Sequence, residues 1–199
     1  MFKDLFRKKT AEEKFWSWFK NCEELYFRFE IDRDRLFGLL NKELTKIHSD
    51  LVFEFGPVEN GKREFVISAN GIKSAFPFVI SLAESAPPLE KWTIIRFRQG
   101  RGPSEISYGS VQLDSSDIYF EHAVDNDKIG IRLHIKDYVD NPEWGMAIFI
   151  ILDSTIGEYN TEMRISWIEK TRLDESRISS LKPLSDLPRI IDQLKIALN

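Results

Sequence analysis

The amino-acid sequence predicts an α+β protein, with a mixed, largely antiparallel sheet and helices packed mainly on one face. Three observations lead to this fold class. Apolar residues recur with helical spacing through residues 1–49. Two stretches, 51–98 and 117–171, then each show the order hairpin, helix, strand, which we call a ββαβ unit. A last helical stretch, 185–198, closes the chain, and we expect residues 1–199 to form a single domain.

Two helices are expected in the first 49 residues. Thr10 and Glu13 have the spacing of a capping box, in which the hydroxyl accepts from the third helical N–H and the carboxylate reaches back. The helix that follows carries an aromatic face, made by Phe15, Trp16, Trp18 and Phe19. A second helix is expected to begin near Asp32, with an apolar stripe of Leu36, Leu40, Leu44 and Ile47.

The first ββαβ unit is expected to open with an irregular hairpin. Asn60-Gly61 is a turn dipeptide between two alternating stretches, and a two-residue loop there pairs Glu59 with Lys62. The apolar faces of the two strands then match imperfectly. This mismatch predicts a bulge at Gly56-Pro57, because proline has no N–H to donate to the ladder. A helix and a strand over residues 91–98 complete the unit.

The hairpin of the second unit has a register that the sequence over-determines. A tip at Asn126-Asp127 places seven apolar residues and one histidine on a single face: Ile118, Phe120, His122, Val124, Ile129, Ile131, Leu133 and Ile135. The other face pairs Glu121 with Arg132 and Tyr119 with His134. We expect this second face to be polar and exposed to solvent.

A buried helix is expected over residues 142–156, because this apolar stretch is too long for an average strand. Asn141 is its expected N-cap, and Gly157 is expected to end it in a left-handed conformation. We expect residues 158–160 to turn the chain directly into a strand that carries Met163, Ile165 and Trp167.

Three blocks of sequence between about residues 50 and 170 support this fold class: "GPVENGKREFVISANG", "AFPFVISLAESAPPLEKWTIIRFR" and "LDSTIGEYNTEMRISWIE". They resemble blocks found in a group of small bacterial proteins classed as domains of unknown function. The resemblance implies an α+β fold and a bacterial, intracellular setting. It implies no activity and assigns no catalytic residues.

Composition limits the classes of function. The net charge of −4 disfavours a general affinity for nucleic acid, because domains that bind it are basic. With one cysteine, Cys22, the chain has no intrachain disulfide and no cysteine cluster for zinc, and we expect Cys22 to be a small buried hydrophobe. The longest strictly apolar run, 146–152, is far shorter than the roughly 20 residues of a membrane span. The first ten residues lack the apolar stretch of a secretion signal. We therefore expect a cytoplasmic protein that binds neither nucleic acid nor membranes.

The sequence predicts no catalytic residues, no metal and no cofactor. His122 and His134 fall on opposite faces of the expected hairpin, so they cannot share a metal ion. The segment 125–130 resembles the start of a calcium loop, but Ile129 and Lys136 stand where oxygen ligands are required. The chain contains no nucleophile elbow, no phosphate-binding loop and no dinucleotide-binding motif.

Five residues remain as candidates for binding a ligand or a partner. Arg96, Arg98 and Arg101 form the densest basic patch, and Arg96 and Arg98 are expected to share one strand face. Asp153 and Glu158 flank the expected helix end, so their carboxylates could approach each other. Each group also has a simpler explanation, either as solvated arginines at a strand end or as residues of a helix-to-strand junction.

Two hypotheses of function follow. The first is a non-enzymatic protein-binding module, such as an adaptor or a toxin-neutralising, immunity-like protein, because aromatic residues that can anchor an interface make up 13% of a chain without catalytic motifs. The alternative is a small-molecule or anion-binding protein, or an enzyme, with a pocket near Arg96, Arg98 and Glu158. We favour the first. The sequence leaves the identity of any partner and the oligomeric state open.

Overall fold

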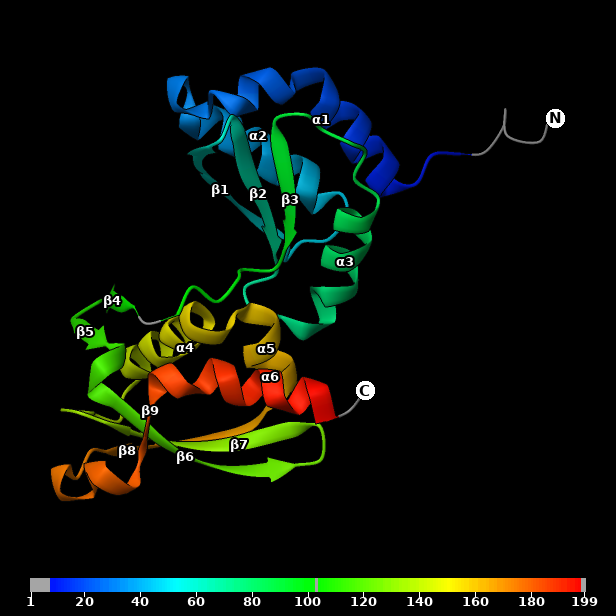
Figure 1. The fold of residues 1–199 in the computed structure, drawn as a ribbon. Coiled ribbons are helices and arrows are strands. Elements are labelled where there is room, and N and C mark those ends of the chain that lie inside the picture. The colour runs from blue at the N-terminus through cyan, green and yellow to red at the C-terminus, as the bar shows by residue number, and fades with distance from the viewer. Residues whose placement is uncertain (1–7, 103, 198–199) are drawn as a thin grey trace. The chain divides into compact units, whose positions relative to one another are not determined.

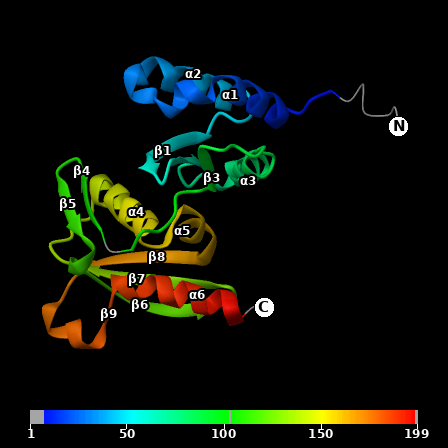
Figure 2. The ribbon, with the colours of Figure 1, turned by 45° about the horizontal axis from the view of Figure 1, so that its top comes forward.

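The computed structural model describes residues 8–102 and 104–197, and it confirms the α+β class (Figures 1 and 2). Two compact units, Met1–Phe97 and Arg98–Asn199, can be distinguished within the chain that we expected to form a single domain. Each unit contains one of the two predicted ββαβ arrangements. A polar stretch with two glycines and a proline, residues 98–104, directly follows this boundary, and we had interpreted it as a loop within one domain.

The first unit consists of a helical part and a three-stranded sheet. Its elements are α1 (Ala11–Phe27), η1 (Phe29–Ile31), α2 (Arg33–Thr45), β1 (Val52–Glu59), β2 (Lys62–Ser68), η2 (Lys73–Ala75), α3 (Phe76–Glu84) and β3 (Trp92–Arg96). Strand β2 is central, antiparallel to β1 and parallel to β3. Helix α3 makes the crossover that a parallel pair requires.

The predicted start of α1 is confirmed. The Glu13 N–H donates to Thr10 Oγ1 at 3.2 Å, and the Thr10 N–H donates to Glu13 Oε2 at 2.9 Å. Helix α2 begins directly after Asp32, although this carboxylate binds the Arg35 side chain instead of capping the helix backbone. The predicted stripe of α2 is buried at Leu36, Leu40 and Leu44.

The predicted bulge of the first hairpin is also confirmed. Glu59 opposes Lys62 as expected, and the register then shifts between Phe55 and Val58. As a result Phe55 opposes Phe65, so that two aromatic side chains share a face. The bulge therefore removes the mismatch that the sequence pattern contained.

Aromatic rings form the core of the first unit. Phe65 is fully buried, and six ring centroids lie 5.1–6.4 Å from its own: those of Phe15, Trp16, Phe19, Phe53, Phe55 and Trp92. The Arg63 guanidinium lies at the edge of this cluster, 4.6 Å from the Phe29 ring centroid. It donates to the Gly56 carbonyl at the bulge at 3.0 Å and to Glu30 at 2.7 Å. The buried cation is thus paired, as its burial requires.

The second unit is built on a four-stranded sheet. Its elements are β4 (Glu105–Tyr108), β5 (Val111–Asp114), η3 (Ser115–Asp117), β6 (Ile118–Asp125), β7 (Lys128–Ile135), α4 (Pro142–Ile156), α5 (Glu158–Arg164), β8 (Ile165–Arg172), η4 (Glu175–Ser180), β9 (Lys182–Pro183), η5 (Leu184–Asp186) and α6 (Leu187–Ala197). The strand order is β8-β7-β6-β9, with β7 and β8 parallel, while β4 and β5 form a separate pair. The predicted C-terminal helix begins two residues later than expected, and residue 198 lies outside the described residues.

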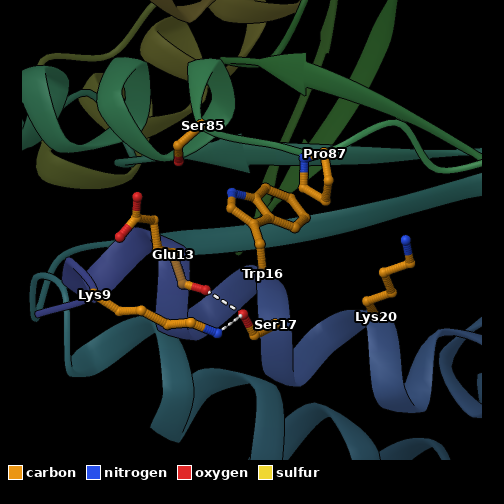
Figure 3. Close-up of a pocket in the computed structure, with 7 residues that line it drawn as sticks. All are labelled: Lys9, Glu13, Trp16, Ser17, Lys20, Ser85 and Pro87. Carbon is orange, nitrogen blue, oxygen red and sulfur yellow. Dashed lines mark hydrogen bonds between the residues drawn. The ribbon is translucent and has the colours of Figure 1, made fainter. Parts of the chain in front are cut away.

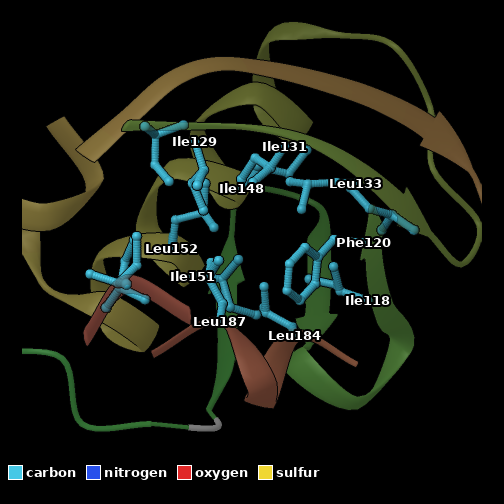
Figure 4. Close-up of a cluster of buried hydrophobic side chains, with 14 of the residues drawn as sticks. Ile118, Phe120, Ile129, Ile131, Leu133, Ile148, Ile151, Leu152, Leu184 and Leu187 are labelled. Atoms are coloured by element: carbon cyan, nitrogen blue, oxygen red, sulfur yellow. The ribbon is translucent and has the colours of Figure 1, made fainter. Parts of the chain in front are cut away.

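The predicted register of the second hairpin is confirmed along its whole length, from Ile118 opposite Ile135 to Val124 opposite Ile129. Its apolar face is covered by α4 and α6 (Figure 4). The core formed there is mostly aliphatic, and its helical members include Ile148, Ile151, Leu152, Leu187 and Ile191.

The opposite face of this hairpin is less exposed than expected. His134 was predicted to face solvent, but it is only 2% exposed. Its Nε2 donates to Glu121 Oε2 at 3.1 Å, and Arg177 from η4 binds the other oxygen of Glu121 at 2.7 Å. The segment that follows β8 therefore reaches the polar face, which strand periodicity alone does not indicate.

The prediction that residues 158–160 turn directly into a strand is wrong. Residues 158–164 form the short helix α5, and the strand begins at Ile165. Met163 and Ile165 are apolar and two positions apart, which is the spacing of one face of a strand, although Met163 belongs to the helix. Glu158 in the first turn and Arg164 in the last turn complement a helix dipole, which is the signal that indicates α5.

Candidate functional site

The predicted basic patch is divided between the two units. Strand β3 ends at Arg96, and Phe97 has a positive φ of 61°, so the alternation of the strand stops before Arg98. The prediction that Arg96 and Arg98 share a strand face is therefore wrong. Arg96 Nη1 binds Glu84 Oε1 on α3 at 2.7 Å, whereas Arg98 and Arg101 belong to the second unit.

Arg98 and Arg101 are held by their backbones at the junction of α4 and α5. The Arg98 N–H donates to Glu158 Oε2 at 3.2 Å, and the Glu158 N–H donates to the Arg98 carbonyl at 3.0 Å. The Arg101 N–H donates to the Ser154 carbonyl at 2.8 Å. Glu158, which we had considered as a candidate for binding a ligand or a partner, is fully buried, and its carboxylate accepts this backbone N–H.

Two glycines allow this close backbone contact. A Cβ on Gly100 would lie 2.6 Å from the Thr155 carbonyl oxygen, and a Cβ on Gly157 would lie 2.9 Å from the Gly100 nitrogen. Gly157 has φ 85° and ψ 149°, a region that essentially only glycine adopts. The predicted positive φ at the end of α4 is thus confirmed, but ψ is extended where a left-handed helical cap was expected.

Asp153 also lies at this junction, near the end of α4, and its side chain is partly buried. Burial raises the pKa of Asp153 to about 6, and the nearby charges of Glu158 and Glu162 add to this effect. A hydrogen bond with Thr161 and the charge of Arg98 act in the opposite direction. A carboxyl with this pKa can exchange a proton near neutral pH, so the junction has one group that is suited to acid–base chemistry.

Cys22 was expected to be buried, but it is of intermediate exposure. Burial raises the pKa of the Cys22 thiol to about 11, which keeps it protonated and a poor nucleophile. In residues 8–102 and 104–197, no three His, Cys, Asp or Glu side chains are grouped so that they could hold a metal ion. The same residues include no helix with the length and apolarity to cross a membrane.

An open groove of about 620 Å³ lies along α1 in the first unit (Figure 3). We call it the α1 groove, and its lining residues are Lys9, Glu13, Trp16, Ser17, Lys20, Ser85 and Pro87. Several of its polar groups are bonded within the unit: Lys9 Nζ donates to Ser17 Oγ at 2.9 Å, and Trp16 Nε1 donates to the Leu82 carbonyl at 2.7 Å. These bonds leave few donors directed at a ligand.

A second open groove, of about 450 Å³, lies between β6 and α6 in the second unit. We call it the β6–α6 groove, and it is lined by His122, Val124, Lys182, Arg189, Ile190, Gln193 and Leu194. Ile190 and Leu194 are 7% and 9% exposed and form its apolar floor, while Val124 is 65% exposed. Burial, followed by the charge of Lys182, lowers the pKa of His122, so this histidine is neutral at neutral pH.

The five candidate residues from the sequence line neither groove. The β6–α6 groove was missed although the sequence placed His122 and Val124 on the core face. The alternation along β6 predicts on which side of the sheet each side chain lies. It does not predict how much of that side α6 covers.

Comparisons of the chain with protein-family models, with curated proteins and with solved structures found no match. The resemblance to a group of bacterial domains of unknown function therefore stays a prediction.

Proposed function

We propose that the protein is a non-enzymatic module that binds a segment of another protein in the β6–α6 groove. One observation carries the proposal. Val124 lies on the same face of β6 as the fully buried Ile118 and Phe120, yet it is 65% exposed. The apolar core face of the hairpin thus continues beyond its cover of helices, where a partner can bury it.

The composition of the groove also supports a protein partner. Its apolar floor is surrounded by Lys182, Arg189 and Gln193, which is the arrangement of apolar centre and polar rim found in protein interfaces. The groove is open, whereas small-molecule sites enclose most of the ligand surface. An adaptor or immunity-like role in the cytoplasm forms part of the same proposal.

The experiment compares three forms of the protein as bait for capture from a native lysate. We expect the wild-type chain to retain a partner in stoichiometric amounts and Val124→Asp to lose it. Val139→Asp is the matched control, because Val139 is also exposed, at 54%, and does not line the groove. Circular dichroism checks that both variants are folded. Equal capture by Val124→Asp and the wild type contradicts the proposal.

A second hypothesis keeps a ligand-binding or enzymatic role for Arg98, Asp153 and Glu158 in the second unit. The observation that favours it is the raised pKa of Asp153, about 6. An anion bound at this junction changes that pKa, so an NMR titration of the Asp153 carboxyl with and without phosphate tests the idea. Identical titration curves rule out phosphate as a ligand there.

A further inference from the structure

We infer that the β6–α6 groove selects a segment in which an apolar side chain stands next to a carboxylate. This inference rests on the proposed function and names the chemistry of the partner. The apolar floor of Ile190 and Leu194 takes the apolar side chain. The basic side chains of the rim, Lys182 and Arg189, take the carboxylate.

The two cations come from different elements and are available to a partner. Lys182 lies on β9 and forms no ion pair with the residues that the structure describes. Arg189 lies on α6, and its Nη2 is 3.8 Å from Asp186 Oδ2, beyond the range of a good hydrogen bond. Both side chains can therefore turn toward a carboxylate without breaking a strong internal contact.

Charge complementarity favours an acidic occupant over a basic or neutral one. The chain as a whole has a net charge of −4, yet among the described residues the charged side chains that line this groove, Lys182 and Arg189, are cations. Such local reversal of charge steers partners of the opposite sign and excludes partners of the same sign. His122 adds a ring nitrogen at the same wall, so a carboxylate there has a further polar neighbour.

The open shape of the groove favours a peptide over a fatty acid, which shares the combination of apolar chain and carboxylate. An acyl chain is bound well where a cavity encloses it. In the β6–α6 groove, Val124 remains 65% exposed, so an occupant is covered on one side only. A peptide keeps its solvated backbone on the open side and inserts one side chain.

The test uses three fluorescent peptides of twelve residues that alternate leucine with glutamate, with lysine or with serine. Binding to the full chain is measured by fluorescence anisotropy at low and high salt. We expect the glutamate peptide to bind about tenfold more tightly than the other two at low salt, since each exposed pair contributes modestly, and to lose this advantage at high salt. Lys182→Glu combined with Arg189→Glu should reverse the preference toward the lysine peptide.

The matched control is Lys170→Glu on β8, an exposed lysine that does not line the groove. It should leave all three affinities unchanged. If all three peptides bind equally and Val124→Asp abolishes their binding, the selection for acid is wrong while the proposed function stands. If no peptide binds but decanoate does, a fatty carboxylate is the occupant and the inference is overturned. If nothing binds and Val124→Asp also leaves lysate capture unchanged, the proposed function fails with it.

Discussion

In the first unit, α1 covers the sheet with aromatic rings around Phe65, whereas in the second unit α4 and α6 cover it with isoleucine and leucine. The strand pairing beneath these cores is the same. A hairpin forms first, a helix crosses over, and the last strand joins the hairpin in parallel. The topology therefore does not determine the chemistry of the core. The helices that cover the two sheets carry different residue types, and the side chains of the strands in each core are mostly of the same type as those of the covering helices.

The two units also place their strand irregularities differently. In the first unit the bulge lies in β1, and the Arg63 side chain binds its Gly56 carbonyl. In the second unit the hairpin is regular, and the irregularity lies between β7 and β8, next to Gly130. A ββαβ unit thus tolerates a bulge in either outer strand, because the central strand remains paired with both of its neighbours.

The largest expected effect is the loss of the central ring of the first unit. Phe65→Ala should lower the free energy of unfolding by about 3–5 kcal/mol, because it removes a large buried side chain and leaves a cavity. Urea denaturation followed by tryptophan fluorescence measures the change. Leu25→Ala on α1 is the control, since Leu25 is 46% exposed and should matter by less than about 0.5 kcal/mol.

If the first core depends on contacts between rings, Phe65→Leu should lower the free energy of unfolding more than Phe120→Leu does. Among the described residues, Phe120 is the one aromatic side chain in the buried cluster of the second unit, whose other members are aliphatic. Leucine should therefore be tolerated better at position 120 than at position 65. Equal destabilisation by the two substitutions would show that the two cores respond alike.

The second prediction concerns the helix junction, which has no counterpart in the first unit. Gly157→Val should destabilise the protein by at least about 2 kcal/mol, because valine is strained at this backbone conformation and its Cβ meets the Gly100 backbone. Thermal unfolding reports the loss. Gly145→Ala in α4 is the matched control, as nothing lies within 4 Å of its Cβ position. It should stabilise the helix by about 0.5–1 kcal/mol, and a melting temperature that Gly157→Val leaves unchanged would argue against the junction.

The third prediction is a pH dependence from Asp153. The folded-state pKa of about 6 lies above the ordinary value of 3.8, so the folded protein holds this proton more tightly than the unfolded chain. The stabilising contribution is complete below about pH 4 and is lost as the pH rises through about 6. Asp153→Asn should therefore raise the free energy of unfolding by about 1–2 kcal/mol at pH 7.5 and leave it unchanged at pH 4. An equal effect at both pH values means that burial does not perturb this carboxyl.

The sequence predicted those features that local patterns determine. The register of β6 and β7 follows from alternation along both strands, and the capping box of α1 follows from the spacing of Thr10 and Glu13. The bulge in β1 could be predicted because an unbulged ladder would have paired unlike faces.

Features that depend on packing between distant segments could not be predicted in this way. The exposure of Val124 depends on where α6 lies relative to β6, and the burial of His134 depends on the path of η4. The backbone contact of Arg98 with Glu158 joins residues 60 positions apart. The sequence analysis therefore grouped Arg98, Asp153 and Glu158 correctly but misplaced Arg96. No local sequence pattern indicated the β6–α6 groove, which carries the proposed function.

The smallest expected effect tests the irregularity of the second unit. A Cβ on Gly130 would lie 1.8 Å from the ring of Trp167, so Gly130→Ala must displace this half-exposed ring. We expect a loss of about 1 kcal/mol in the free energy of unfolding, because an exposed side chain can move aside more easily than the backbone at Gly100. A double-mutant cycle with Trp167→Ala isolates the contact, and the loss should disappear in the double variant. If the loss persists without the tryptophan, the strain comes from the β7–β8 ladder itself, and the two units then differ in how their outer strands accommodate a bulge.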